Sequence, residues 1–579
     1  MGAKMQHSRK RFCYVALAIA LVTIVVGITV TQKFGIKKIW TQKNSVLTPP
    51  PGIDDKKPNV PVARSYQRLQ ATHYFADTYP KNFWNSFEPA DVARDFSQIK
   101  ADGFNAIVLV LPWAEFQPVL TSNGYDEKMF DRLKMLMDEA SAHELGVVLR
   151  LSYVWSYRPD AENSIFNRMH GVFHDEAMRQ TWLKHLAKIH THVAKHPAFR
   201  LAFLSWEDLY PMAITSMTPN LSDQNMLRMY REYLSRTSTL SDISTLNGKT
   251  ISSWDALPFP DRKSPSYAKV LDYWDDALLN RLFIPANQNF PNLSLEVRSD
   301  WDPVWEKDGK TTWKNHALTY ALPGTDTLTS YYAIAWGMKN EGDFVSAADT
   351  IKGFDRFIAH LAAEKNHQHL FLDQFLFYYE LEEFKRNTQI KPEERDIFLQ
   401  AVAQRFRELD ISYALWYYRD YVDNAVYNAH FSLGLEGWRA SEGVRVSKLA
   451  DGHYAALLNK GNEVSQKIPV QQRSAWKGGN EPLNVCITPG PGDDRRLELV
   501  TGDQAVTMTW RKGEKRQCVK VKRGTELLLT IKANTDALAI DLVELFTVLE
   551  PSAVYDRDLK VGAQRDAIRK LNAMVSEQK

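Results

Sequence analysis

The sequence predicts a (β/α)8 barrel followed by an antiparallel β-sandwich, both placed after an N-terminal transmembrane helix. Between residues 67 and 425, apolar strand-like runs alternate eight times with amphipathic helical runs, as in a barrel of parallel strands covered by helices. From 426 to 550 the pattern changes to short alternating strands separated by glycine and asparagine turns, which is typical of a sandwich. Residues 12–31 are apolar and uncharged over the ~20 residues that a spanning helix needs.

The N-terminal segment divides into a flank, a span and a spacer. Residues 1–11 form a short flank that ends in a basic cluster at Arg11, directly before the span at 12–31. A cleaved signal peptide is the alternative, but the apolar run is long for one and no small-x-small cleavage site follows it. Lysines lie on both sides of the span, so the short flank and the large C-terminal body favour a body outside the cytoplasm. The proline-rich residues 32–66 are expected to form an extended spacer.

Charge and cysteine usage exclude several classes of function. Lys+Arg 72 nearly balance Asp+Glu 69, and no basic stripe indicates a nucleic-acid partner. His190 and His192 have no His-x-x-x-His spacing, and no glycine-rich phosphate loop follows the first strand, so neither a metal nor a cofactor is expected. Outside the span, Cys486 and Cys518 lie on sandwich strands, where they either form a disulfide in an exported body or remain separate buried thiols.

Each barrel unit combines an apolar strand with an amphipathic helix. The first helix places Val92, Phe96 and Ile99 on one stripe, and Gly103 ends it. A polar excursion at Asn225–Pro291 follows strand four. The strands are expected at Leu69–Phe75, Ala106–Leu111, Val147–Tyr153, Leu201–Trp206, Leu293–Val297, Thr329–Ala335, Leu370–Phe377 and Ile411–Trp416, and the helices at Pro89–Ala101, Glu127–Leu145, Asp175–Lys195, Ala347–Lys365 and Pro392–Leu409. An open doubly wound sheet is the alternative, and the missing glycine-rich loop counts against it.

The pattern of residues 426–550, after the barrel, predicts short alternating strands. Residues 551–579 then form a charged tail, either a short helix or a frayed end. Whether the sandwich binds sugar depends on Trp438, Trp476 and Trp510, because an exposed row favours binding and burial favours a bracing role. The sandwich strands are expected at Val444–Lys448, Ala455–Leu458, Leu483–Thr488, Leu497–Val500, Val506–Trp510, Cys518–Val521, Glu526–Ile531 and Leu538–Phe546.

Tryptophans and carboxylates gather at the ends of the barrel strands. Strand four ends in Trp206-Glu207-Asp208, and five more apolar strand candidates also run to a tryptophan. Because the carboxyl ends of barrel strands meet at one mouth, this pattern predicts an aromatic cleft with interleaved carboxylates. A sugar chain needs such groups, since its CH faces stack on indoles and its hydroxyls bond to carboxylates. The alternative is that the indoles are core, but the strand interiors hold Val, Ile and Leu.

Glu207 at the end of strand four resembles the acid/base glutamate of the (β/α)8 glycoside hydrolase clan that includes cellulases, β-mannanases and β-galactosidases. In that clan the glutamate usually follows an asparagine, and here Trp206 precedes it. The segment Ala414–Asp420 is similar to the end of the clan's strand eight, where a tryptophan forms the floor of the subsite for the cleaved sugar. The resemblance covers the whole barrel in outline and implies a pair of catalytic carboxylates.

The second carboxylate of such a pair is harder to assign. The resemblance places a nucleophilic glutamate at the end of strand seven, where this chain has Asp373, Gln374 and Phe375. Adjacent strand residues face opposite sides, so only one of the first two points into the mouth unless a bulge re-aims it. An inward Asp373 serves as nucleophile or base, whereas an inward Gln374 closes the double-displacement route. Other candidates are Glu296, Asp300 and Glu380.

The first and last strands of the sandwich, at Asn428–Trp438 and Ala539–Leu545, resemble those of jelly-roll carbohydrate-binding modules. The catalytic residues expected from the resemblance of the barrel to the glycoside hydrolase clan and from the strand ends are Glu207 and Asp373. The substrate-binding residues are expected to be Trp113, Tyr153, Trp206, Asp208, Glu296, Arg298, Trp301, Trp336, Gln374 and Trp416.

Together these features predict a membrane-anchored glycoside hydrolase that acts on a β-linked polysaccharide, with a retaining mechanism favoured. Its role would be exopolysaccharide synthesis, trimming or release at the cell envelope, from the cytoplasmic (inner) membrane with the body facing the periplasm or exterior. The alternative is a catalytically inactive glycan-binding or scaffolding subunit of a polysaccharide export machine. Expected partners are the polysaccharide, the membrane through residues 12–31, and other subunits of an exopolysaccharide synthesis complex.

Overall fold

The structure is a computed structural model of the chain, and it describes the residues given next. These are residues 67–153, 158–161, 165–205, 224–260, 266–297, 304–305, 311–312, 322–332, 344–364, 369–377, 388–469, 482–492, 494–502, 504–522, 526–547, 549–552 and 554–577. The expected anchor at 12–31 and the spacer at 32–66 lie outside them. Among the described residues, no helix has the length and apolar character needed to cross a membrane.

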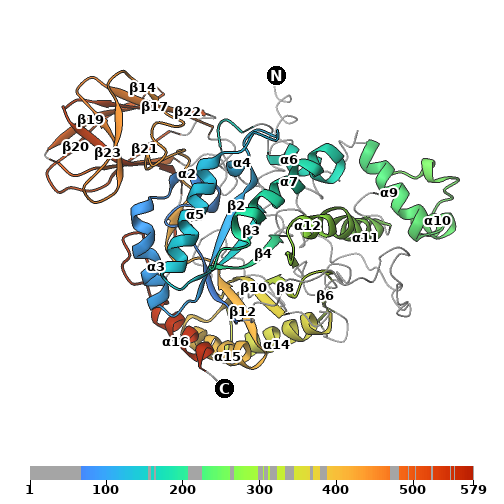
Figure 1. Cartoon of the computed structure of the whole chain (residues 1–579). Helices are drawn as coiled ribbons and strands as arrows, with labels where there is room; N and C mark the ends of the chain where they lie inside the picture. Colours follow the sequence, from blue (N-terminus) through green and yellow to red (C-terminus); the bar gives the residue numbers. More distant parts are fainter. Residues whose placement is uncertain are drawn as a thin grey trace, which may run out of the picture.

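Eight parallel strands close into a barrel, which confirms the predicted fold class (Figure 1). Their order around the barrel is β1-β12-β10-β8-β5-β4-β3-β2, so each strand pairs with its neighbours in the chain and the last returns to the first. The strands are β1 (Gln70–His73), β2 (Ala106–Pro112), β3 (Gly146–Tyr153), β4 (Phe199–Ser205), β5 (Ser294–Val297), β8 (Thr327–Tyr331), β10 (His369–Phe375) and β12 (Ile411–Leu415).

The barrel has two apolar cores, because its strands are buried on both faces. One small cluster fills the interior and includes Ala71, Val148, Phe203 and Phe371, while a larger one packs the outer faces of the strands against the helices. The helices are α2 (Pro80–Ser86), η1 (Pro89–Asp91), α3 (Val92–Ala101), α4 (Trp113–Phe116), α5 (Glu127–Ala142), α6 (Ile165–His174), α7 (Glu176–Val193), α14 (Ala347–Glu364), η5 (Pro392–Glu394) and α15 (Arg395–Glu408).

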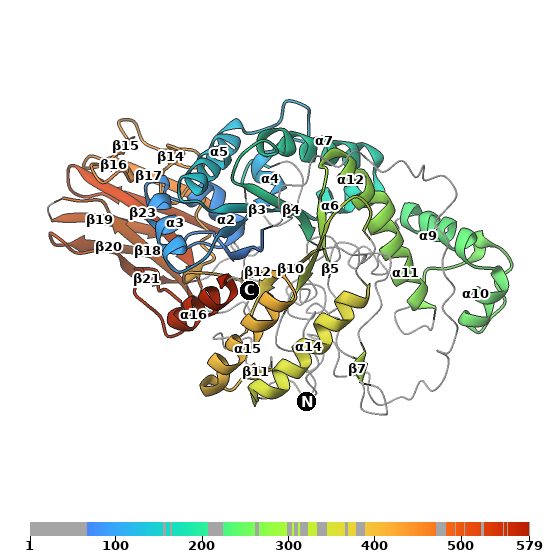
Figure 2. The ribbon, with the colours of Figure 1, turned by 60° about the horizontal axis from the view of Figure 1, so that its bottom comes forward.

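The polar excursion after β4 is largely helical. It projects from the side of the barrel opposite the sandwich in both views of the chain (Figures 1 and 2). Its elements are α9 (Gln224–Thr237), α10 (Leu240–Asn247), η2 (Trp254–Ala256), α11 (Tyr267–Ala277), the π-helical turn η3 (Leu278–Phe283) and α12 (Ile284–Asn289). Short strand pairs join β6 (Val304–Trp305) to β7 (Thr311–Thr312), and β9 (Phe344–Val345) to β11 (Gln389–Ile390).

Two antiparallel five-stranded sheets form the predicted β-sandwich around one shared apolar core. One sheet has the order β14-β17-β22-β19-β20 and the other β15-β16-β23-β18-β21. The strands are β14 (Arg439–Ala440), β15 (Arg445–Lys448), β16 (Tyr454–Leu458), β17 (Glu463–Pro469), β18 (Leu483–Pro489), β19 (Arg495–Thr501), β20 (Gln504–Trp510), β21 (Gln517–Val521), β22 (Glu526–Ala533) and β23 (Leu538–Phe546).

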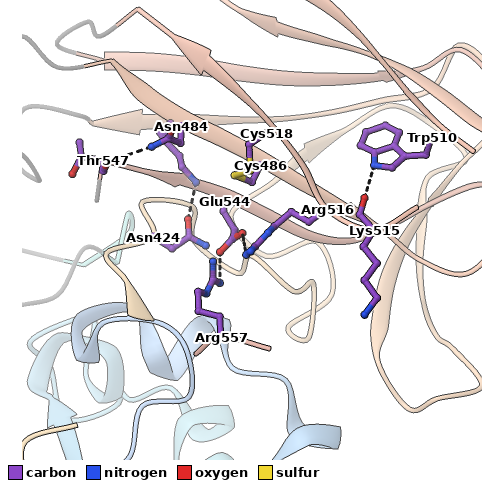
Figure 3. The surroundings of a disulfide bond; sticks show 11 residues. Asn424, Asn484, Cys486, Trp510, Lys515, Arg516, Cys518, Glu544, Thr547 and Arg557 are labelled. Atoms are coloured by element: carbon purple, nitrogen blue, oxygen red, sulfur yellow. Dashed lines mark hydrogen bonds and ion pairs between the residues drawn. A yellow bond between two sulfur atoms is a disulfide. The ribbon is translucent and has the colours of Figure 1, made fainter. Parts of the chain in front are cut away.

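A disulfide between Cys486 and Cys518 joins β18 to the edge strand β21, so the paired alternative of the sequence analysis holds (Figure 3). On the side toward the barrel, Glu544 of β23 accepts hydrogen bonds from Arg516 and Arg557. Arg557 also contacts Asp77, which follows β1, at 2.6 Å. This arginine, whose side chain is 8% exposed, therefore links the sandwich to the barrel and raises the cost of separating them.

The chain returns from the sandwich to the barrel and ends in an ordered helix instead of a frayed tail. The strand β24 (Leu549–Glu550) pairs with β13 (Tyr421–Val422), and α16 (Arg565–Ser576) then packs against α15 (Figure 1). Asn572 of α16 is fully buried and donates to the backbone oxygen of Asp102, while Tyr413 of β12 donates to its side chain. The helix thus lies beside the N-terminal ends of β1 and β2, away from the C-terminal strand ends where barrel sites form.

Candidate active site

A layer of buried polar side chains lies at the C-terminal end of the barrel interior. On β1, β3, β4 and β10 its members lie two residues beyond an apolar interior residue, which is the spacing at which successive side chains on a strand face the same way. Thus Phe371 is followed by Asp373 on β10, and Ala71 by His73 on β1. The polar members of this layer are His73, Arg150, Ser205, Glu296 and Asp373, all of them buried.

Asp373 faces the barrel interior. Its Oδ1 lies 2.7 Å from Nε2 of His73 on β1. The strands β1 and β10 are not neighbours, because β12 lies between them. The bond therefore spans the interior past β12, where the inward residue is the small Ala414. Asp373 itself has no exposed surface.

A bulge in β10 accompanies this orientation. The pairing of β10 with β12 shifts register between Leu372 and Phe375, and Gln374 adopts φ 51°, in the left-handed region that residues other than glycine rarely occupy. Residues held in that region often mark functional sites. The bulge lies directly beside the carboxylate that the sequence analysis singled out, while the predicted substrate contact of Gln374 stays a prediction.

Glu296 brings a second carboxylate into the interior layer. It lies on β5 without exposed surface, and its Oε2 accepts a hydrogen bond of 2.7 Å from Ser205 at the end of β4. Since only β8 separates β5 from β10, Glu296 and Asp373 enter the barrel about two strand spacings apart, or ~9 Å. Glu296 therefore lies within the same interior layer as Asp373, and its role as a substrate contact stays a prediction.

Among the predicted aromatic platforms that the structure describes, Trp416 is the best placed. It follows β12, is partly exposed, and packs its edge against the ring of His73 with 4.9 Å between ring centroids. Tyr153, at the end of β3, is buried; its ring lies 5.2 Å from the guanidinium of Arg150, and its hydroxyl donates to that of Tyr79. Both residues lie at C-terminal strand ends, so their predicted contacts with a sugar remain open to test.

Trp113 corrects one prediction. Its side chain is only 2% exposed, its indole nitrogen donates to Gln117, and its ring packs against Arg168 of α6 and His185 of α7. Arg168 and His185 are on helices outside the barrel, so the indole points away from the interior and serves as core instead of a sugar platform. The chain turns into α4 immediately after β2, and this turn redirects the side chain.

Several predicted site residues lie outside the described residues, so the structure places none of them. They are Trp206, Glu207, Asp208, Arg298, Trp301 and Trp336, together with the alternatives Asp300 and Glu380. Sequence reasoning also missed residues that the structure brings into the polar layer. Arg150 interrupts the apolar strand β3, while His73 and Ser205 are the last residues of β1 and β4. All three are buried polar side chains on the interior-facing register, a signal that the sequence contains.

Among the described residues, one group of side chains has the geometry to hold a metal ion. Glu88, His430 and Asp541 each offer one ligand atom, and these atoms lie within 4.8 Å of one another at the boundary between barrel and sandwich. His453 stands beside them, with Nδ1 3.5 Å from Asp541 and Nε2 3.3 Å from Asp91. Hydrogen bonds to Asp541 and Asp91 raise the pKa of His453 to about 10, so an imidazolium already balances these carboxylates.

The two described tryptophans of the sandwich are buried. Trp438 donates to the backbone oxygen of Asn428, and Trp510 donates to that of Lys515 (Figure 3). Trp476 lies outside the described residues. On the criterion set by the sequence, Trp438 and Trp510 favour a bracing role for this domain over a row of sugar platforms.

No protein-family model matches the chain, and no curated protein is similar to it in sequence. Among solved structures, it is similar to GH5_18 from Streptomyces cattleya in complex with GlcNAc, with 13% identity over 61% of this chain and 72% of that chain and a TM-score of 0.37. It is also similar to the exo-β-1,4-mannosidase Op5Man5 from Opitutaceae bacterium strain TAV5, with 14% identity, 61% and 53% coverage and a TM-score of 0.37. It is similar as well to the β-galactosidase from Rahnella sp. R3, with 12% identity over 62% of this chain and 51% of that chain and a TM-score of 0.41.

At identities and TM-scores this low, the likenesses carry no argument about activity. The fold rests instead on the strand pairing of the chain itself. The closed parallel barrel is the architecture that the resemblance to the glycoside hydrolase clan implied, and the sandwich follows it as expected.

Proposed function

We propose that the protein is a glycoside hydrolase that cleaves a β-linked polysaccharide by a retaining mechanism. One observation carries the proposal: a carboxylate, Asp373, faces the interior at the C-terminal end of the seventh barrel strand, the position from which a nucleophile acts in this class of barrel. Glu207 at the end of strand four would be the general acid and base. Trp416 would supply an apolar face for the sugar.

In the proposed mechanism, Glu207 protonates the leaving oxygen while Asp373 bonds to the anomeric carbon. Water then attacks that carbon, gives its proton to Glu207, and releases Asp373. A retaining enzyme holds its two carboxyl groups roughly 5 Å apart. Because an aspartate is one methylene shorter than a glutamate, the bulge beside Asp373 supports the proposal by offering a backbone displacement that compensates for the shorter reach.

The test compares Glu207→Gln with the wild-type full chain on β-linked polymers and on aryl β-glycosides. We expect the variant to lose hydrolysis of the polymer while it retains glycan binding, because the amide keeps the shape of the side chain but has no proton to give. An aryl glycoside with a good leaving group needs less protonation and should retain some turnover. Full activity of the variant on polymer would rule out the assignment of Glu207.

A second candidate function is a glycan-binding scaffold with the barrel of a hydrolase. The observation that favours it is Gln374, which occupies the sequence position of the clan's nucleophile and cannot act as one. Such a protein would not hydrolyse polymer even as the wild type. Its Asp373→Asn variant would bind polymer with the wild-type affinity. Product release measured by reducing-end analysis over a panel of β-glucans, β-mannans and β-galactans separates the two candidates.

We further propose that residues 12–31 anchor the body to the cytoplasmic membrane, where it acts on exopolysaccharide during synthesis, trimming or release. An anchor, a spacer and an appended sandwich would keep the barrel near a polymer that emerges at the envelope, which raises its effective concentration. The disulfide between Cys486 and Cys518 supports an exported body. Removal of residues 1–40 should leave a soluble protein that cleaves added glycan but does not support polymer production, and full rescue by this truncation would contradict the anchoring role.

A further inference from the structure

The pair formed by His73 and Asp373 leaves one atom of each side chain without a partner. His73 Nε2 and Asp373 Oδ1 are 2.7 Å apart, but neither His73 Nδ1 nor Asp373 Oδ2 has a hydrogen-bond partner among the described residues, although both atoms are buried. Nearly all buried polar atoms in proteins are hydrogen-bonded, and an unpartnered one costs free energy. A buried carboxylate oxygen kept in that state points to a function for it.

The geometry fixes which oxygen is committed and which remains available. With Asp373 as the carboxylate of the proposed mechanism, Nε2 is the ring nitrogen that donates, because it faces Oδ1, while no described residue accepts from Nδ1. The ring is held in turn by the edge of Trp416, 4.9 Å away between centroids, and is fully buried. His73 therefore binds Oδ1 from a fixed direction, and Oδ2 is left as the free oxygen of Asp373.

Stability alone gives little reason for such a pair. A buried polar pair must be desolvated, and replacing one with apolar side chains of similar volume is often neutral or stabilising. On β1, β10 and β12 the interior below the pair is apolar, with Ala71, Phe371 and Ala414. On β1 and β10 the change to a bonded polar pair occurs at the C-terminal strand ends, where barrel chemistry takes place.

We propose that His73 is a positioning residue that holds Asp373 through Oδ1 and so makes Oδ2 the atom that bonds to the anomeric carbon. This inference rests on the proposed function and refines it. As Oδ2 forms its bond, the bond from the anomeric carbon to the leaving oxygen breaks, and Glu207 supplies the proton to that oxygen. In the second step a water oxygen replaces Oδ2 on the carbon, and the water proton passes to Glu207. His73 donates to Oδ1 throughout and transfers no proton.

The experiment compares His73→Leu with His73→Gln in the full chain. A glutamine places its amide nitrogen near the position of Nε2, so it keeps the donor, whereas leucine removes it. We expect His73→Leu to lower kcat about 10- to 100-fold, the effect of one hydrogen bond to a charged group, with little change in KM. His73→Gln should recover most of that loss. Thr329→Val is the matched control, because it removes the interior hydrogen bond to Ser294 without touching the pair.

The outcomes separate this inference from the proposed function. If the wild type hydrolyses a β-glycoside and His73→Leu does so equally well, or if Gln and Leu are equally impaired, His73 does not position Asp373 and the inference falls while the hydrolase survives. If the wild type hydrolyses nothing on the panel, the proposed function falls and the inference with it. Melting temperatures of the three variants, measured in parallel, show whether a loss of kcat follows the donor or only a loss of folded protein.

Discussion

His453 offers a test of how the sandwich is held to the barrel. Its two ring nitrogens face Asp541 of β23 at 3.5 Å and Asp91 of η1 at 3.3 Å, so the imidazolium bridges both parts of the chain. Asp91 also contacts Arg94 at 2.8 Å, and Asp541 faces His430 at 3.8 Å. Burial opposes ionisation of Asp541, but the two facing histidines, His430 and His453, outweigh it and lower its pKa to about 2. We expect His453→Gln to weaken this interface.

The size and the pH range of the effect follow from the raised pKa. The pKa of His453 rises from 6.5 to about 10, which in full would correspond to ~4–5 kcal/mol. The side chain is 26% exposed, so solvent screening reduces the contribution to ~1–2 kcal/mol. Since the folded pKa is above the unfolded one, this stability is fully present below pH ~6.5 and is lost as pH rises toward about 10.

The assay is the free energy of unfolding as a function of pH for the full chain and two variants. His143→Gln is the matched control, because His143 is 25% exposed and bonds a carboxylate, Glu139, at 3.0 Å within a single helix. We expect His453→Gln to lose ~1–2 kcal/mol near pH 6 and to converge with the wild type near pH 10, while the control changes by at most ~0.5 kcal/mol. Equal curves for His453→Gln and the wild type at every pH would refute the reasoning.

Two further predictions concern other contacts of the fold. Replacing Asn572 with Ala should lower the free energy of unfolding by ~2–3 kcal/mol, because it leaves the buried Tyr413 hydroxyl and the Asp102 backbone oxygen without their partner. An unchanged melting temperature would contradict the role of α16 in packing against the barrel. Replacing Cys486 and Cys518 together with Ala should lower stability by ~3–4 kcal/mol, given the sequence separation of 32 that the bond closes, and the loss should match that caused by a reductant in the wild type. A variant as stable as the wild type under oxidising conditions would show that the bond does not form.

The sequence predicted the barrel because each strand carries its signal locally. Continuous apolar runs such as Ala106–Pro112, bounded by helix stops, are visible without any tertiary information. The same holds for the sandwich, whose strands alternate between buried and exposed residues, as in Glu526–Ala533. The final helix was harder to place, because its burial depends on Asn572 contacting segments far away in the chain.

The candidate site was predictable only in part. The period of two along a strand could not decide between Asp373 and Gln374, because the bulge beside them breaks that period. His73 was missed because its partner is 300 residues away and on a strand that is not its neighbour. Trp113 was misassigned because the turn into α4 redirects a residue that the strand pattern places at the mouth.

The most direct test of the central claim is covalent trapping of the nucleophile. The full chain is incubated with activated 2-deoxy-2-fluoro β-glycosides of the gluco, manno and galacto series, and the labelled peptide is mapped by mass spectrometry. The account predicts one sugar adduct on the peptide that contains Asp373, and none in Asp373→Asn. An adduct on Glu296 would move the nucleophile to β5. The claim that this barrel is a retaining glycoside hydrolase would be contradicted if the wild type formed no adduct and also released no product from β-linked polymers.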